Sequence, residues 1–342
     1  MAVTMRDVAA KAGVSPVVVS HVLHKKAATI RVGEATAERV RQAAVELGYS
    51  CNIWARNFRA QQTYTIGAIH GHGFPRPILS SGSRYFSALL DGLMEGAFSY
   101  GYSITLCKQL LGGSPNDAMS DGRFDGLVWY STLDSETTAK MLLGCSVPLV
   151  LVHSRSRDFG GVIPTVICDN DQGIGLAVDH LFGLGHRRIA YALNLGWQYA
   201  ETSLRLTAFR EHMRRRGIAI TDDDEIRVDT DLSELEAYIA RRPRHTAIVA
   251  NNEGLAAEIV ARAQRHGIAI PYELSVVGFD STSYCEEIRP TLTAVRQPLV
   301  ELGRRAIDLL VQRIRGEACE QPEVVVPCGL DVRGSTAPPP CK

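Results

Sequence analysis

The chain has 342 residues, of which 45% are hydrophobic and 22% charged, and its 37 basic side chains balance 37 acidic ones. At roughly 100–200 residues per domain, this length predicts two or three domains. No stretch reaches the ~18 consecutive apolar residues that a membrane-spanning helix needs. Arg6, Asp7 and Lys11 stand where a signal peptide would carry its apolar segment. We therefore expect a cytoplasmic protein without a membrane anchor.

The balanced total conceals an uneven distribution of charge. Residues 1–62 hold nine basic and four acidic side chains, a net charge of +5, so the remaining 280 residues carry −5. A basic segment joined to an acidic body is typical of a nucleic-acid-binding module attached to another domain. Many N-termini are basic for no such reason, so the charge alone leaves both interpretations open.

The first 50 residues predict three helices. The first begins after Thr4, a suitable N-cap, and ends at Gly13. Its apolar face has helical spacing and consists of Met5, Val8, Ala9 and Ala12. The second opens at Ser15-Pro16, where proline fits the first turn, and runs to about Leu23. The third follows Gly33 and runs to Leu47.

Two short helices joined by a glycine-containing turn are typical of a helix-turn-helix, whose second helix enters the major groove of DNA. That helix carries Val17 and Val18 on its expected exposed face, beside Ser20 and His21. Exposed valines are explained if they contact the methyl groups of thymine. A three-helix bundle without a DNA-binding role is the alternative.

From residue 64 onward, short β-branched runs alternate with helical stretches. The predicted strands are Tyr64–Ile69, Tyr102–Leu106, Gly126–Tyr130, Val147–His153, Arg188–Leu193, Thr246–Ala250 and Leu274–Gly278. The predicted helices are Tyr85–Tyr100, Ser135–Gly144, Asp171–Phe182, Thr202–Arg216, Gly254–His266 and Pro298–Arg315. This alternation predicts an α/β protein with two doubly wound parallel sheets, whose ligands bind at the carboxyl ends of the strands.

Two sets of motifs resemble the lactose-repressor/galactose-repressor (LacI/GalR) family. Near the N-terminus they are Thr4–Ser15, Val19–Leu23, Ala28–Val32 and Leu47–Tyr49. In the body they include Phe124–Val128, Gly185–Ala190, Ala250–Glu253, Ser275–Asp280, Pro290–Thr293 and Leu330–Thr336. The resemblance covers nearly the whole chain. It implies an all-α helix-turn-helix head and a hinge helix, then two subdomains of the periplasmic-binding-protein type joined by three crossover strands.

The resemblance also implies domain boundaries. The helix-turn-helix domain would take residues 1–48 and the hinge helix 49–62. The first subdomain would take 63–164 and 290–320, the second 165–289 and 321–336, and residues 337–342 would form a tail.

Matching to the family assigns DNA contacts in two segments. In the head they are Thr4, Ser15, Pro16, Val17, Val18, Ser20, His21, Thr29 and Arg31. In the hinge helix they are Asn52, Ala55, Arg56, Phe58 and Arg59. The family's hinge helix folds on the operator and wedges an apolar side chain into the minor groove. On the reading helix, Val18 replaces the family's usual small Thr or Ala and His21 the usual Arg, so we expect unusual outer bases in the operator. Phe58 replaces the usual Leu as the wedging side chain, a role that Phe can also fill.

The effector-contacting residues implied by the family pattern are Asp134, Arg205, Asn251 and Asp280, with Tyr85 and Phe86 stacking on a ligand face. His70 follows the first strand and also faces the expected cleft. Asp134 has a second interpretation as a helix cap, and Arg205 as the ion-pair partner of a carboxylate. His70 and His72 are spaced for a metal, but no third ligand stands nearby, so we expect no metal site.

Neither a nucleotide-binding loop nor a GxSxG or HExxH motif is present, and the eight cysteines lack CxxC spacing, so we expect no enzyme and no cofactor. The resemblance implies a sequence-specific transcriptional repressor that binds a palindromic operator in double-stranded DNA as a homodimer. Its dimer face would include Tyr85–Tyr100 and Leu302–Leu310. A sugar-like small molecule in the cleft would control it. A solute-binding protein and an enzyme on the same scaffold are the alternatives. The effector's identity, whether it induces or co-represses, and the operator sequence stay open.

Overall fold

The computed structural model describes residues 3–24, 31–50, 62–70, 84–107, 121–130, 136–195, 200–242, 244–319 and 321–340. Contacts divide the chain into two units, Met1–Thr63 and Tyr64–Lys342, called here the head and the body. The three-helix head and the two-sheet body confirm the predicted fold class. Apart from the hinge helix, most of which lies outside the described residues, the predicted helices and strands recur with ends shifted by at most two residues.

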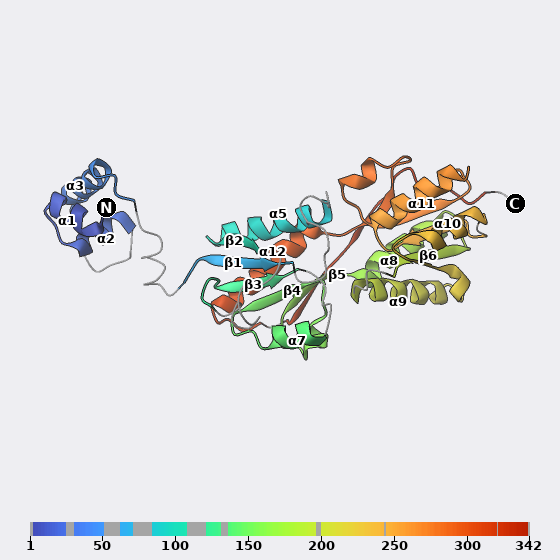
Figure 1. Cartoon of the computed structure of the whole chain (residues 1–342), viewed down its shortest axis with the longest axis horizontal. Helices are drawn as coiled ribbons and strands as arrows, with labels where there is room; N and C mark the ends of the chain where they lie inside the picture. The colour runs from blue at the N-terminus through green and yellow to red at the C-terminus, as the bar shows by residue number, and fades with distance from the viewer. Residues whose placement is uncertain are drawn as a thin grey trace. The chain divides into compact units, whose positions relative to one another are not determined.

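The head consists of α1 (Met5–Ala12), α2 (Pro16–His24) and α3 (Glu34–Glu46) (Figure 1). Thr4 caps α1 as predicted, because its hydroxyl accepts from the Asp7 amide while the Asp7 carboxylate accepts from the Thr4 amide. Gly13 ends α1 in the left-handed region at φ 65°. Small apolar side chains from all three helices form one core, namely Val8, Ala9, Ala12, Val19, Val40, Ala43 and Ala44.

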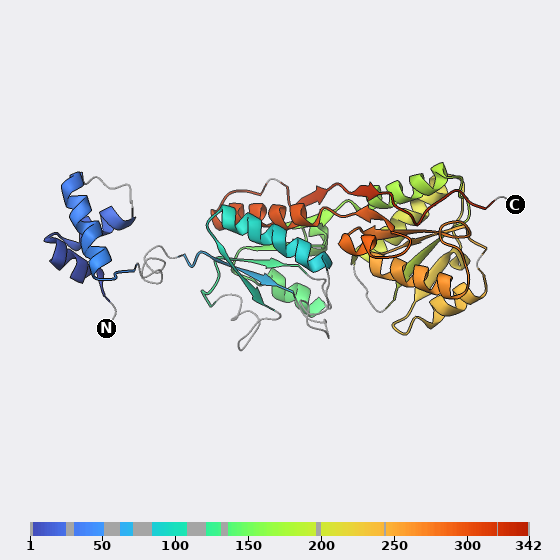
Figure 2. The same cartoon turned by 90° about the horizontal axis from the view of Figure 1, so that it is seen from above.

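The first sheet of the body has six strands in the order β11-β5-β4-β3-β1-β2, all parallel. Their bounds are β1 (Thr65–Ile69), β2 (Ser103–Cys107), β3 (Gly126–Trp129), β4 (Leu149–Val152), β5 (Thr165–Cys168) and β11 (Glu323–Val326). Helices α5 (Arg84–Ser99) and α12 (Leu299–Ile314) cover one face, and α7 (Glu136–Leu143) the other (Figures 1 and 2). The turn η1 (Ser156–Phe159) joins β4 to β5. These elements are the first subdomain.

The second sheet has the order β12-β10-β9-β8-β6-β7, and β12 alone is antiparallel to its neighbour. Its strands are β6 (Ile189–Asn194), β7 (Glu225–Val228), β8 (Ala247–Ala250), β9 (Ser275–Asp280), β10 (Thr293–Arg296) and β12 (Gly329–Asp331). The helical elements are α8 (Asn170–Gly183), α9 (Ala200–Arg215), η2 (Asp222–Asp224), α10 (Ser233–Ala240), α11 (Glu253–Arg265) and η3 (Ser283–Glu286). These elements are the second subdomain.

The chain crosses between the sheets after β5, after β10 and after β11, which corrects three of the predicted boundaries. Strand β5 pairs with β4 in the first sheet, although residues 165–289 were assigned to the second subdomain. Strand β10 pairs with β9 in the second sheet, and β11 with β5 in the first. Each strand hydrogen-bonds to the sheet it leaves before the chain crosses, so sheet pairing places the crossings a few residues later than motif matching does.

The predicted tail begins as part of the second subdomain. The Ala337 carbonyl accepts hydrogen bonds from the Ser275 hydroxyl and from the His186 ring, while its amide donates back to Ser275. Residues 341 and 342 lie outside the described part of the chain.

Close packing fixes α5 against α12. A side chain at Gly92 would strike the Val300 backbone, and one at Gly303 would lie 2.5 Å from the Leu89 carbonyl oxygen. Glycine at both positions therefore allows the two helices to approach closely, and this contact holds Tyr85 at the start of α5. Among the described residues, no helix is both long and apolar enough to cross a membrane.

Candidate functional site

The second helix of the head presents part of the predicted DNA-contacting set to solvent. Ser15, Pro16 and Val17 are exposed, and Val17 is 59% exposed although it is apolar. Val18, which was expected on the same exposed face, is half-buried, as are Ser20 and His21. The position of each residue around the helix explains why Val17 is more exposed than Val18. Val18 is adjacent to the fully buried Val19 and therefore lies nearer the buried face of α2 than Val17 does.

The remaining predicted DNA contacts divide between the ends of helices and undescribed segments. Thr4 and Arg31 are exposed at the entrances to α1 and α3. Thr29 lies outside the described residues, and so do all five hinge positions, Asn52, Ala55, Arg56, Phe58 and Arg59. Their roles stay predictions.

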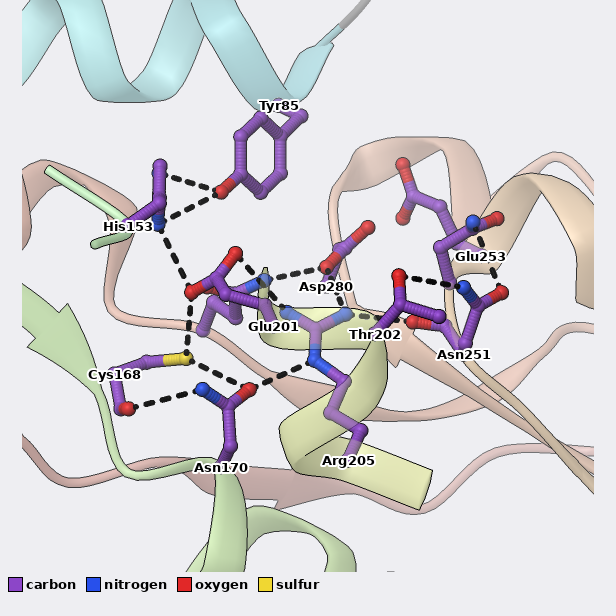
Figure 3. Close-up of polar contacts among 12 residues, drawn as sticks. Tyr85, His153, Cys168, Asn170, Glu201, Thr202, Arg205, Asn251, Glu253 and Asp280 are labelled. Atoms are coloured by element: carbon purple, nitrogen blue, oxygen red, sulfur yellow. Dashed lines mark hydrogen bonds and ion pairs between the residues drawn. The ribbon is translucent and has the colours of Figure 1, made fainter. Parts of the chain in front are cut away.

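In the body, the carboxyl ends of parallel strands from both sheets meet at one polar cluster (Figure 3). His153 follows β4, Cys168 ends β5, Asn251 follows β8 and Asp280 ends β9. Helix α9 adds Glu201, Thr202 and Arg205, and α8 adds Asn170. This edge is where open α/β sheets bind ligands.

Arg205 lies at the centre of the cluster and is only 6% exposed. Its Nε donates to Asn170 Oδ1 over 2.8 Å and its Nη1 to the Asn251 carbonyl oxygen over 2.6 Å. The guanidinium carbon lies 3.7 Å above the centre of the Phe279 ring. Hydrogen bonds and stacking therefore fix the guanidinium plane.

Two buried carboxylates flank Arg205, each with an oxygen 3.8 Å from a guanidinium nitrogen. They belong to Glu201, one turn earlier on α9, and to Asp280. Burial alone would lower the pKa of Arg205, but these two charges raise it, so Arg205 is a permanent cation. The interpretation of Arg205 as the partner of a carboxylate is confirmed, and its contact with an effector stays a prediction.

Asp280 has an unusual backbone and an unusual acidity. Its φ of 96° is rare for a residue with a side chain, and such strain concentrates at functional sites. Burial raises the pKa of its carboxyl group to about 6 despite the nearby Arg205 and a hydrogen bond from Gln297. Asp280 therefore gains or loses a proton close to neutral pH more readily than an ordinary aspartate.

Asn251 is 3% exposed and links the cluster to two neighbouring side chains by hydrogen bonds. Its side-chain nitrogen donates to the Thr202 hydroxyl over 3.4 Å, and its side-chain oxygen accepts from Asn252 over 3.1 Å. Asn252 in turn caps α11, since its own oxygen accepts from the Leu255 amide.

The first subdomain contributes aromatic rings instead of charges. His70 packs 4.8 Å from the Phe86 ring and 5.2 Å from the Tyr130 ring, centroid to centroid. Burial lowers the pKa of His70 to about 4, so its imidazole is neutral at neutral pH. Tyr85 packs edge-on against Phe86 at 5.3 Å. The rings of His70, Tyr85, Phe86 and Tyr130 thus form one aromatic cluster, called here the aromatic wall.

One histidine joins the two subdomains. His153 Nε2 lies 2.6 Å from the Tyr85 hydroxyl, and its Nδ1 lies 3.1 Å from Glu201 Oε1. Burial would raise the pKa of Glu201, but His153 and Arg205 outweigh it and lower that pKa below its ordinary value. Glu201 is therefore an anion that faces His153 across the subdomain boundary.

Of the predicted effector residues, the structure brings Arg205, Asn251 and Asp280 into one cluster and places His70, Tyr85 and Phe86 in one aromatic wall. Asp134 lies outside the described residues. Sequence reasoning missed His153 and Glu201, although each had a signal. His153 directly follows the predicted strand's apolar run, as His70 follows the first, and Glu201 precedes Arg205 by one helical turn.

Two family models match the chain. The model described as "Bacterial regulatory proteins, lacI family" matches residues 4–52, and the one described as "Periplasmic binding protein-like domain" matches residues 178–336. Together with the helix-turn-helix head and the polar cluster between two sheets, these matches define a DNA-binding transcriptional regulator. Its body is of the periplasmic-binding-protein type. In the described part of the chain, no group of three or more histidine, cysteine or acidic side chains is arranged to hold a metal.

The HTH-type transcriptional repressor PurR of Vibrio parahaemolyticus is 30% identical over 343 residues, which span 94% of this chain and 97% of that protein. The Lac repressor dimer bound to operator and the anti-inducer ONPF superposes with a TM-score of 0.80 at 24% identity, covering 98% of this chain and all of that one. A regulator of the same family from Enterococcus faecium, with bound ribose, has a TM-score of 0.66 at 25% identity over 80% of this chain and 99% of its own. The chain belongs to the LacI family of bacterial regulatory proteins, whose relatives here are repressors and not enzymes.

Proposed function

We propose that this chain is a cytoplasmic repressor that binds a palindromic operator as a homodimer. A sugar or sugar derivative, held between the aromatic wall and the Arg205 cluster, changes its affinity for the operator. The observation that carries this proposal is the pairing of a neutral aromatic wall from one subdomain with hydrogen-bonding side chains from the other.

That pairing fits a polyol with flat apolar faces. Asp280 and Glu201 accept hydrogen bonds from hydroxyl groups, Asn251 both donates and accepts, and Phe86 offers a face for stacking. The ribose bound to the Enterococcus faecium neighbour supports a ligand of this class. A ligand that bridges both subdomains favours one arrangement of them, which is the requirement for allosteric control.

Exposed apolar side chains on the first subdomain support a homodimer. Phe98 and Met94 on α5 are 84% and 53% exposed, and Leu106 on the neighbouring β2 is 46% exposed. Such residues on one surface mark a protein interface. The Leu302–Leu310 helix, also part of the predicted dimer face, buries Leu302 and Leu310 in its own subdomain but exposes Arg304 and Arg305. The proposed dimer face is therefore α5 with β2 and the exposed side of the Leu302–Leu310 helix.

The DNA half of the proposal is tested with an operator selected from random DNA. Arg56→Ala is expected to weaken binding to operator and unrelated DNA by the same factor and to reduce the salt dependence by about one phosphate contact. Val17→Ala is expected to weaken operator binding by roughly tenfold and leave unrelated DNA unaffected. Equal losses on both DNAs for both variants would contradict the assigned roles.

The effector half is tested by thermal-shift screening of the full chain against sugars, sugar acids, nucleosides and polyols. A ligand that binds only the folded protein raises the melting temperature. We expect a sugar to do so, and Asp280→Asn to weaken its binding by at least tenfold. Asp179→Asn, on the exposed surface of α8, is the matched control and should bind normally. A panel without any stabilising sugar would count against this ligand class.

A further inference from the structure

We propose that Tyr85, His153 and Glu201 form a latch that holds the two subdomains together before any effector binds. Tyr85 and His153 belong to the first subdomain, whereas Glu201 belongs to the second. His153 is therefore tied through one ring nitrogen to its own subdomain and through the other to the opposite one (Figure 3). The latch itself does not depend on the proposed function; only its effect on operator binding does.

The hydrogen-bonding roles in the latch follow from the partners. Glu201 is an acceptor, so His153 Nδ1 carries a hydrogen and donates to it. In the neutral ring Nε2 is then an acceptor, and the Tyr85 hydroxyl donates to it. A protonated ring would keep the Glu201 contact and donate to the Tyr85 oxygen instead. The three side chains are thus complementary in both protonation states of His153.

Burial makes this contact a strong one. His153 is 5% exposed and Glu201 is 7% exposed, and hydrogen bonds to a charged group gain strength where water is excluded. A second ion pair between the subdomains, Arg84 with Glu287, lies at the surface, where such pairs contribute little. The His153–Glu201 contact is thus better shielded from water than the Arg84–Glu287 pair.

The backbone at His153 supplies an independent observation. Its φ of 67° lies in the left-handed region, which a residue with a side chain rarely adopts. Its amide donates to the Val166 carbonyl oxygen over 3.0 Å, which fixes this conformation. Strained positions persist where the surroundings hold them and where function uses them. Here the strained backbone conformation of His153 places its imidazole between Tyr85 and Glu201.

The molecule contains a matched control for the latch. Tyr238, His245 and Asp224 repeat the Tyr–His–carboxylate arrangement, with hydrogen bonds of 2.6 and 2.8 Å and a histidine that is 5% exposed. All three lie in the second subdomain, around β7, β8 and α10. Loss of His245 should lower stability without changing how the subdomains are arranged, whereas loss of His153 should change the arrangement.

Double electron–electron resonance on the full chain, without ligand or DNA, measures this directly. Arg157 and Arg214 are exposed and lie in the first and second subdomains, and each is replaced by a ketone-bearing residue for spin labelling, because the chain has eight cysteines. Dilution with unlabelled protein removes distances between protomers. His153→Ala is expected to raise the ratio of long to short distances roughly tenfold or more, the loss expected for one hydrogen bond to a charged group.

Two further variants make the result decisive. Glu201→Gln retains an acceptor but loses the charge, so it should give an intermediate ratio. His245→Ala should give the wild-type distances even where its melting temperature falls as far as that of His153→Ala. Unchanged distances in His153→Ala, or equal changes in both histidine variants, would overturn the latch. Changed distances with unchanged operator affinity would support the latch and contradict the coupling in the proposed function.

Discussion

The two subdomains build their parts of the candidate site in the same way but supply opposite chemistry. In both, side chains stand at the carboxyl ends of parallel strands. The first subdomain supplies the rings of His70, Phe86 and Tyr130, whereas the second supplies a guanidinium between two carboxylates. Burial explains the contrast, because a buried group either stays neutral or needs an opposite charge beside it. The aromatic side uses the first solution and the Arg205 side the second.

The same burial also shifts two titrations in opposite directions. It lowers the pKa of His70 to about 4 and raises that of Asp280 to about 6. In both groups the shift favours the neutral form: His70 stays unprotonated to a lower pH than usual, and Asp280 stays protonated to a higher pH than usual. We therefore expect the stability of the protein to depend differently on charge and on pH at the two groups of residues. The variants below test this expectation.

The largest effect is expected from Arg205→Met on the charged side. The substitution keeps an apolar stem but leaves Glu201 and Asp280 buried beside each other without their cation, which typically costs about 3–5 kcal/mol. Equilibrium urea unfolding measures the loss. Arg214→Met, on the same helix but exposed and paired with the nearby Glu211, is the control and should change stability by less than about 1 kcal/mol. Similar losses of unfolding free energy in both variants would show that the buried Arg205 ion pairs stabilise the protein no more than an exposed pair does.

Most of the fold that positions these groups could be predicted from the sequence. The capping pair at Thr4 and Asp7 and the apolar strands ending near His70 and Asp280 are local patterns, and local patterns decide these elements. The predicted strands did not include β5, β7, β10, β11 and β12. Of these, β7, β11 and β12 lie at sheet edges, where polar or partly exposed residues interrupt the apolar run, whereas β5 and β10 are mostly buried runs of only four residues. The assignment of β5 and β10 to a sheet depends on pairing with strands far away in the sequence.

The candidate site was predicted less completely, for a related reason. Arg205, Asn251 and Asp280 were assigned to one site by matching to the family, and the structure brings them into one cluster. His153 and Glu201 are 48 residues apart, and the structure alone brings them together. A rule applied to every strand end, instead of only to the first, would have singled out His153. Nothing local indicates that Glu201 lies opposite it.

The next largest effect is a pair of opposite pH dependences. Asp280 keeps its proton in the folded state up to about pH 6, whereas it releases it near pH 3.8 when unfolded. The folded state then binds more protons, so its contribution to stability falls as the pH rises from about 4 to 6. His70 behaves in the opposite way, because the unfolded state takes up its proton near pH 6.5 and the folded state only near 4. Its contribution therefore rises with pH over the same range.

Single variants should separate these two contributions. At about 1.4 kcal/mol per pKa unit, each group contributes roughly 3 kcal/mol across this range, and the two nearly cancel in the wild type. Asp280→Asn should make stability rise with pH between 4 and 6, and His70→Asn should make it fall. Urea unfolding at several pH values gives both slopes. Slopes of the same sign in the two variants would contradict the comparison.

The smallest effect concerns one hydroxyl in each subdomain. The Tyr85 hydroxyl hydrogen-bonds to His153, so Tyr85→Phe should lower the free energy of unfolding by about 1 kcal/mol. The Tyr191 hydroxyl, in the second subdomain, is buried and has no hydrogen-bond partner among the described residues. Tyr191→Phe removes a group that loses water on folding and gains nothing, so it should leave stability unchanged or raise it by up to about 1 kcal/mol. Thermal unfolding of the two variants side by side measures the difference. An equal loss of stability in both variants would mean that the Tyr85–His153 hydrogen bond adds nothing beyond the packing of the hydroxyl oxygen. His153 would then be positioned by its contact with Glu201 alone.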